Sequence, residues 1–148
     1  MKKLLICLVT SGVASVAGCN RPPATPNPIV GTWFVDDVAA PFRYHMYVFN
    51  ADGTMQQANP DAGDEHTSDS DGKGVWISDG GRIKGKWVEI QADRTTHRFT
   101  GTTQLRFDVK VDHDHFTGTE TPAFFDPQGT QTGSKPATAL DGKRVTLP

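Results

Sequence analysis

Residues 98–111 carry the pattern that most limits what this chain can fold into. Apolar residues, threonine and glycine occupy every second position from Phe99 to Val111, and the residues between them are polar or charged. A period of two places these two sets on opposite faces of a β-strand. A strand with one buried and one solvated face is typical of an antiparallel sheet. Residues 28–148 show no sustained helical repeat, so the pattern predicts an all-β fold.

Shorter segments of the same kind recur along the chain, separated by turn residues. Turns are predicted at residues 50–53, 79–81, 113–114 and 126–129, where Gly, Asp and Asn gather. Strands are predicted over residues 29–36, 43–50, 73–78, 82–92, 98–111, 115–125, 130–139 and 143–147, with another beginning at residue 54. Residues 59–72 are predicted to form a polar, acidic loop. We predict an antiparallel up-and-down meander of about eight or nine strands, which closes into a barrel because closure removes exposed edges.

The first predicted strand contains Gly31-Thr32-Trp33, and Arg144 lies in the last one. With the strand count, this tripeptide resembles the lipocalin-like (calycin) barrels. The resemblance implies that Trp33 plugs the closed end of the barrel and that Arg144 packs across it. It also implies that residues 29–148 form a single barrel domain, either filled by side chains or wide enough for one small ligand.

The hairpin centred on His113 and Asp114 predicts which residues point inward. Val111 should face Phe116, and Phe107 should face Glu120. The inward row of the second strand is Phe116, Gly118, Glu120, Pro122 and Phe124. Glu120 is the one carboxylate in that row, and a buried carboxylate needs a partner or a shifted pKa. Glu120 could therefore orient a polar or cationic ligand group, or pair with Arg106 or Arg144, or reach water at the barrel mouth.

Aromatic residues exceed what one face of a small sheet needs. In the second strand Tyr44, Met46 and Val48 alternate with His45, Tyr47 and Phe49, so both faces are apolar. The extra face either lines a cavity or forms a surface patch for a partner. Four aromatic residues join Glu120 as predicted ligand contacts, namely Tyr44, Phe107, Phe116 and Phe124.

Two acidic segments could attract metal ions, but ordinary structure explains both. Residues 112–115, Asp-His-Asp-His, fit a hairpin tip with one cross-strand His–Asp contact. The loop around Asp69 and Asp71 lacks the remaining ligands of a calcium loop. We therefore predict no metal and no cofactor.

The first 19 residues predict where the protein resides. Lys2 and Lys3 precede an apolar run, and residues 16–19, Val-Ala-Gly-Cys, resemble the lipobox of bacterial lipoproteins. The resemblance implies that residues 1–18 are a signal peptide and that Cys19 carries the lipid. Asn20 in place of aspartate favours the periplasmic face of the outer membrane if the organism has one. Residues 19–28 are rich in proline and form a semi-extended tether.

Composition excludes several functions for the processed chain. Removing residues 1–18 leaves 130 of 148 residues and takes away two lysines, which changes the formal net charge from −2 to −4. This charge argues against nucleic-acid binding. Cys7 and Cys19 are the only cysteines, so no thiol remains for a disulfide or for catalysis.

Three functions remain open. The first is an anchored envelope lipoprotein that binds a small apolar or amphipathic ligand in its barrel. The second is a non-enzymatic lipoprotein with a filled barrel that binds another envelope protein. The third is a cyclase or isomerase that uses few residues, such as Glu120 in a cavity. No nucleophile elbow, phosphate loop or paired catalytic carboxylates appear in the sequence, which favours a non-enzymatic role.

Overall fold

The computed structural model describes residues 26–61 and 63–148. These residues form ten β-strands, and none of them forms a helix long and apolar enough to cross a membrane. The predicted signal peptide, Cys19 and most of the tether lie outside the described residues. The strands are β1 (Gly31–Asp37), β2 (Tyr44–Phe49), β3 (Thr54–Ala58), β4 (Thr67–Asp69), β5 (Gly72–Asp79), β6 (Arg82–Asp93), β7 (Phe99–Asp112), β8 (His115–Phe125), β9 (Gln131–Ser134) and β10 (Thr138–Arg144).

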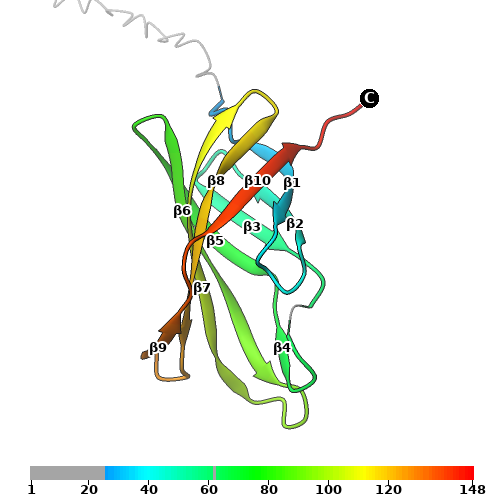
Figure 1. Cartoon of the computed structure of the whole chain (residues 1–148), viewed down its shortest axis with the longest axis vertical. Helices are drawn as coiled ribbons and strands as arrows, with labels where there is room; N and C mark the ends of the chain where they lie inside the picture. The colour runs from blue at the N-terminus through cyan, green and yellow to red at the C-terminus, as the bar shows by residue number, and fades with distance from the viewer. Residues whose placement is uncertain (1–25, 62) are drawn as a thin grey trace, which may run out of the picture.

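Eight of the strands close into an antiparallel barrel. The order β10-β1-β2-β3-β5-β6-β7-β8 follows the chain from β1 onward, and pairing of β10 with β8 closes the ring. Two short strands lie outside this ring, because β4 pairs with β6 and β9 pairs with β8 (Figure 1). The predicted all-β, up-and-down barrel is confirmed, and its closure is consistent with a lipocalin-like barrel. All the barrel strands lie between Gly31 and Arg144, so a chain that begins at Arg21 keeps every pairing.

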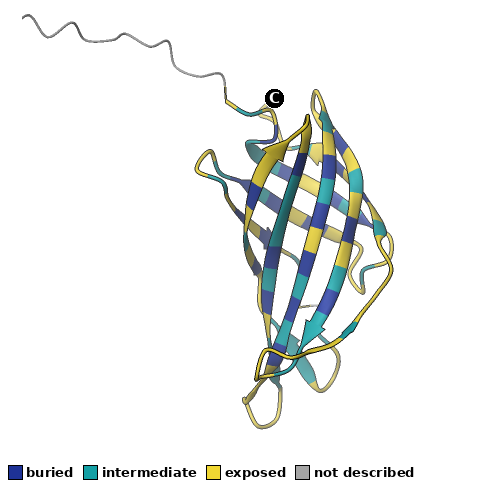
Figure 2. Ribbon diagram, turned by 90° about the vertical axis from the view of Figure 1, so that its left-hand side faces the viewer, coloured by how far each residue is buried: buried dark blue, intermediate teal, exposed yellow. Residues whose placement is uncertain are grey.

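The hairpin of β7 and β8 has the predicted register. Val111 pairs with Phe116, and Phe107 pairs with Glu120. His113 at the tip has a positive φ of 55°, which lets the two-residue turn reverse the chain. Along both strands buried residues alternate with exposed ones, which Figure 2 shows as colour bands running around the barrel.

Two segments differ from the sequence prediction. The chain end predicted as strands 130–139 and 143–147 forms β9, a break at residues 135–137 and then β10, which ends at Arg144. Pro136 lies in that break, and proline cannot donate to a strand ladder. The segment predicted as an acidic loop, residues 59–72, contains the short strand β4. Two groups of β4, the Asp69 backbone N–H and the Ser68 hydroxyl, donate hydrogen bonds to the carboxylate of Asp61.

The barrel core is aromatic at one end. Trp33 lies 5.0 Å from Phe116 between ring centroids, and Phe49 makes edge contacts with Trp76, Phe107 and Phe116. These side chains come from β1, β2, β5, β7 and β8, so one cluster joins five strands. Burial of this much aromatic surface is the main source of stability in a domain that has no disulfide.

Arg144 seals the same end. Its guanidinium lies 4.2 Å from the centre of the Trp33 ring, and it donates hydrogen bonds to the carbonyl oxygens of Pro28 and Val30 and to Asp114. The Trp33 indole N–H donates to the carbonyl oxygen of Ile29 at 2.8 Å. Residues 28–30 therefore cross this end of the barrel, and the described chain begins beside it.

Three aromatic rings lie over glycines on the neighbouring strand. The Trp87 ring lies over Gly72, the Phe107 ring over Gly85, and the Phe116 ring over Gly142. A Cβ atom at position 142 would lie only 2.2 Å from the Phe116 ring, which leaves no space for a methyl group. Each glycine thus makes room for one large core side chain.

Gly142→Ala should lower the unfolding free energy by about 1–3 kcal/mol, because an added methyl group forces a packed ring out of place. The matched control is Gly133→Ala on β9, where the atom nearest to an added Cβ would be Phe124 Cδ2 at 3.8 Å. Urea unfolding followed by tryptophan fluorescence measures both. Equal stability of the two variants would contradict the packing described for Phe116.

Candidate ligand-binding site

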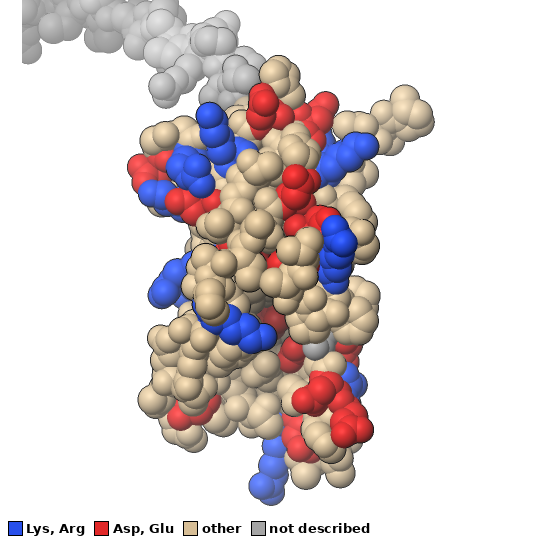
Figure 3. Space-filling model, in the orientation of Figure 1, with Lys and Arg blue, Asp and Glu red and all other residues tan. Residues whose placement is uncertain are grey.

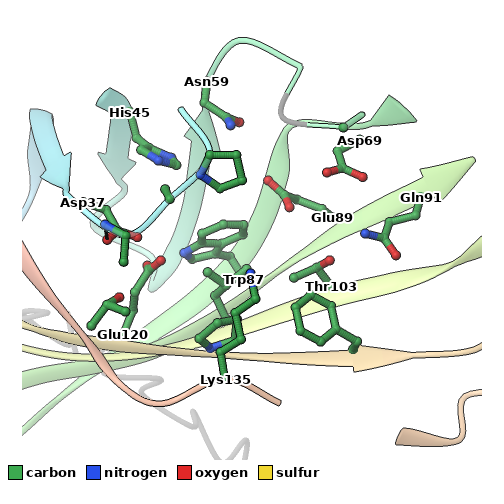
Figure 4. A pocket seen from close by; sticks show the side chains of 18 of the residues that line it. Asp37, His45, Asn59, Asp69, Trp87, Glu89, Gln91, Thr103, Glu120 and Lys135 are labelled. Carbon is green, nitrogen blue, oxygen red and sulfur yellow. Dashed lines mark hydrogen bonds between the residues drawn. The ribbon is translucent and has the colours of Figure 1, made fainter. Parts of the chain in front are cut away.

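A cavity of about 470 Å³ occupies the half of the barrel away from Trp33 and Arg144. Along β8, Phe116 packs on Trp33, while Glu120, Pro122 and Phe124 follow on the same inward face and line the cavity. The β1–β2 loop, Asn59, residues 63–69 and the β9–β10 region complete its wall (Figure 4). Ligand pockets typically measure about 300–1,000 Å³, so this space suits one small molecule.

Glu120 and Asp37 form a buried carboxyl pair on one side of the cavity. Glu120 is 2% exposed and Asp37 is 3% exposed. The Tyr47 hydroxyl donates to Glu120 Oε2 at 2.9 Å, and Asp37 Oδ1 accepts the backbone N–H of Ala39 at 3.0 Å. Burial raises the pKa of Glu120 well above its usual range, and its hydrogen bond with Asp37 and the charge of Asp37 raise that pKa further.

Glu89 and Asp69 form a second acidic pair, on the other side of the Trp87 indole (Figure 4). Glu89 is 6% exposed, and no group in the described chain donates a hydrogen bond to its carboxyl. Burial raises the pKa of Glu89 to about 8, and the charges of Asp69 and Asp71 contribute to this shift. Burial also raises the pKa of Asp69, whose Oδ1 has no hydrogen-bond partner among the described residues.

His45 lines the cavity as a neutral side chain. The backbone N–H of Gly72 donates to Gln57 Oε1 at 2.8 Å, which leaves the Gln57 amide nitrogen to donate to Asn59 and to His45 Nδ1. The remaining proton of the ring is therefore on Nε2. Burial lowers the pKa of His45, so the imidazole does not offset the negative charge of the cavity.

The rest of the wall is mostly apolar. Trp87, Leu105, Pro122 and Phe124 line the space between and below the two acidic pairs. Lys135 is the one lysine or arginine among the described lining residues, and its ammonium lies 5.7 Å from the Phe124 ring centre. The cavity thus combines an apolar wall with an excess of carboxyl groups.

The residues predicted to bind ligand do not form one site. Glu120 and Phe124 line the cavity. Phe107 and Phe116 are buried in the packed aromatic cluster instead, and Tyr44 lies on the outer surface, 49% exposed and stacked on Phe34 at 5.2 Å. Tyr44 points outward because β2 pairs with β1 so that Tyr47 lies beside Trp33. Neither arginine considered as a partner for Glu120 contacts it, since Tyr47 and Asp37 fill that role.

Sequence reasoning missed Asp37, Glu89 and Asp69. The signal for the first two was available, because Asp37 follows Trp33 and Val35 at a spacing of two, and Glu89 follows Trp87 by two. Asp69 lies in the segment predicted as a loop, where no periodicity indicates which way a side chain points.

The acidic segments considered for metals make other contacts. His113 contacts Asp112, while His115 reaches Asp141 at 2.8 Å, and Asp114 accepts from Arg144. Within residues 26–61 and 63–148, no group of three or more His, Cys, Asp or Glu side chains is arranged to hold a metal ion. On the face shown in Figure 3, acidic side chains gather near β4, and basic and acidic groups are interspersed elsewhere.

Comparisons with protein-family models, curated proteins and solved structures give no match for this chain.

Proposed function

We propose that this chain is a membrane-anchored lipoprotein of the cell envelope that binds a small amphipathic ligand in its barrel. The observation that carries the proposal is the cavity of about 470 Å³, which has apolar walls and a few buried polar groups. A space of this kind is the usual form of a small-molecule site. Glu120 is one of its polar groups, and Trp87 and Leu105 supply apolar contact.

The position of the cavity agrees with a membrane anchor. The described chain begins at the barrel end that Arg144 seals, and the cavity lies in the opposite half. Attachment through Cys19 would therefore place the sealed end towards the membrane and the cavity towards the aqueous compartment. A ligand would enter from solution.

A neutral fluorescent probe tests whether the cavity takes up small molecules. We expect N-phenyl-1-naphthylamine to bind the chain from Arg21 onward and Thr103→Phe to abolish binding, because Thr103 is buried and lines the cavity. The matched control is Thr102→Phe, since the neighbouring side chain lies on the other face of β7. Absence of probe binding, or equal binding by the two variants, would argue against a ligand-binding barrel.

Cys19→Ser should release the protein from membranes, because one or more acyl chains on this cysteine would supply its membrane affinity. Ultracentrifugation of lysed cells, followed by immunoblotting of pellet and supernatant, measures the partition. Unchanged recovery in the membrane pellet would contradict anchoring through Cys19.

A protein-binding role has one observation in its favour. Phe34, Tyr44 and Met46 form an exposed apolar patch across β1 and β2, and such patches occur at interaction surfaces. The filled barrel that this alternative requires is not what the structure has, because the cavity remains open in half of the barrel. Ligand binding is therefore the function that the geometry supports best.

A further inference from the structure

We propose that the ligand is an amphipathic amine, whose ammonium group lies against Glu89 and Asp69 and whose apolar body lies along Trp87 and Leu105. This inference rests on the proposed function and names the chemical class of the ligand. It starts from Glu89, a carboxyl group that the fold buries and leaves without a donor.

Glu89 projects from the inward face of β6, two residues beyond Trp87. It is more than nine-tenths buried, lines the cavity and accepts no hydrogen bond from the described chain. A buried carboxyl without a partner costs free energy, which a ligand donor would recover. Asp69 lines the same cavity, and its buried Oδ1 also lacks a hydrogen-bond partner among the described residues. The Glu89 carboxyl and Asp69 Oδ1 are thus two acceptors that lack donors. They suit an ammonium group, which carries three N–H donors.

The charges around Glu89 favour a cation over an anion. Glu89 on β6 is close enough to Asp69, Asp71 and Glu120 for their charges to influence one another's titration. Asp37, beside Glu120, adds to the negative field, while His45 is neutral and contributes no positive charge. Lys135 lies over the Phe124 ring and makes no ion pair with these carboxyls. A carboxylate ligand would be repelled, and a neutral ligand would leave the acceptors without a charged donor.

The walls between the two acidic pairs favour an apolar body. Trp87 separates the Glu89–Asp69 pair from the Asp37–Glu120 pair, as Figure 4 shows. Leu105, Pro122 and Phe124 continue this apolar surface. An amine with an aromatic or aliphatic group could therefore seat its charge at Glu89 and bury its body against the indole.

Three probes of matched shape test the inference, namely 2-phenylethylamine, 2-phenylethanol and phenylacetate. Binding to the ¹⁵N-labelled chain from Arg21 onward is measured by chemical-shift titration, with the Trp87 indole N–H as a reporter in the cavity. We expect the amine to bind at least about tenfold more tightly than the alcohol and phenylacetate not to bind, since hydrogen bonds to charged groups are roughly twice as strong as neutral ones.

Glu89→Gln should remove most of the preference for the amine while leaving the affinity for the alcohol unchanged. Asp69→Asn provides a second variant with the same expected direction. The matched control is Glu65→Gln, an exposed side chain that does not line the cavity, which should bind as the parent chain does. The spectrum of each free variant shows whether its barrel is folded.

Binding of the amine should also tighten by roughly tenfold between about pH 6 and pH 9. Glu89, with a pKa of about 8, loses its proton over this range, whereas an alkylammonium stays charged to about pH 10. In Glu89→Gln this pH dependence should largely disappear. A merely apolar pocket would bind the amine equally at both pH values.

The outcomes separate this inference from the proposed function. If the alcohol or phenylacetate binds as tightly as the amine, the amine inference fails and ligand binding stands. The same holds if N-phenyl-1-naphthylamine binds but none of the three probes does. If neither the probes nor the dye binds, the proposed function itself fails.

Discussion

The free energy of unfolding is expected to fall by on the order of 3–4 kcal/mol between about pH 5 and pH 9, because the folded barrel holds a proton on Glu89 that the unfolded chain releases. The pKa of Glu89 is about 8 in the folded protein, above the ordinary value of 4.5. Where a folded carboxyl has the raised pKa, stability is complete below the unfolded pKa and is lost as pH rises towards the folded one. Glu120 acts in the same direction.

Other groups define the range of pH in which this loss appears. His45 has a lowered pKa in the folded state, so it makes stability rise with pH below about 6.5 and opposes the loss there. Carboxyls with lowered pKa values, such as Asp61 and Asp93, change the stability only at lower pH. The decline should therefore be steepest between about pH 6.5 and pH 8.

Glu89→Gln tests the assignment of this pH dependence. The variant should match the parent chain near pH 5 and exceed its stability at pH 9, because glutamine needs no proton to stay neutral. Glu65→Gln, at an exposed position, should follow the parent chain throughout. Urea unfolding at three pH values measures all three proteins. A parent chain equally stable at pH 5 and pH 9 would contradict the buried acidic cavity.

Trp33→Ala should lower the unfolding free energy by about 3–5 kcal/mol, the usual cost of deleting a large aromatic side chain from a core. Trp33 is fully buried, contacts Phe116 and supports the Arg144 guanidinium that seals the barrel end. Loss of the indole would leave a cavity beneath the Arg144 guanidinium, which would no longer have an aromatic ring to contact. Thermal and urea unfolding of the chain from Arg21 onward measures the change.

Phe34→Ala is the matched control for Trp33→Ala. Phe34 follows Trp33 on β1 but points outward and is 46% exposed, so its truncation should cost less than about 1 kcal/mol. The comparison keeps the strand and the size of the deletion similar while changing the face. A small effect at Trp33, or equal effects at both positions, would show that the sealed end is not the packed part of the core.

The sequence pattern predicted the part of the fold in which the two faces differ most. Inward residues of β7 are apolar or small and outward residues are polar, so a shift of one residue would bury charged side chains. The register of β7 with β8 could therefore be derived from the turn at His113. In β2 both faces are apolar, and the pattern could not decide between Tyr44 and Tyr47. Tyr47 is the tyrosine that points inward, because it pairs with the buried Trp33 on β1. Such pairing depends on the tertiary structure and not on the local sequence.

The acidic site was harder to predict than the barrel. Glu120 was identified because it lies in an apolar row, and the same argument applied to β1 and β6 would have identified Asp37 and Glu89. Asp69 enters the cavity wall through β4, whose place is fixed by its pairing with β6 and by the contact of Asp61 with Arg94. A local sequence pattern does not contain such contacts.

Native mass spectrometry of the chain from Arg21 onward, purified from its own host, shows whether the barrel carries a ligand. We expect a reproducible excess over the polypeptide mass, which is lost on collisional activation as a small molecule that carries a basic nitrogen. Glu89→Gln should retain less of it than Glu65→Gln does. The bare polypeptide mass in every preparation, together with no response to the neutral dye, would contradict a ligand-binding barrel.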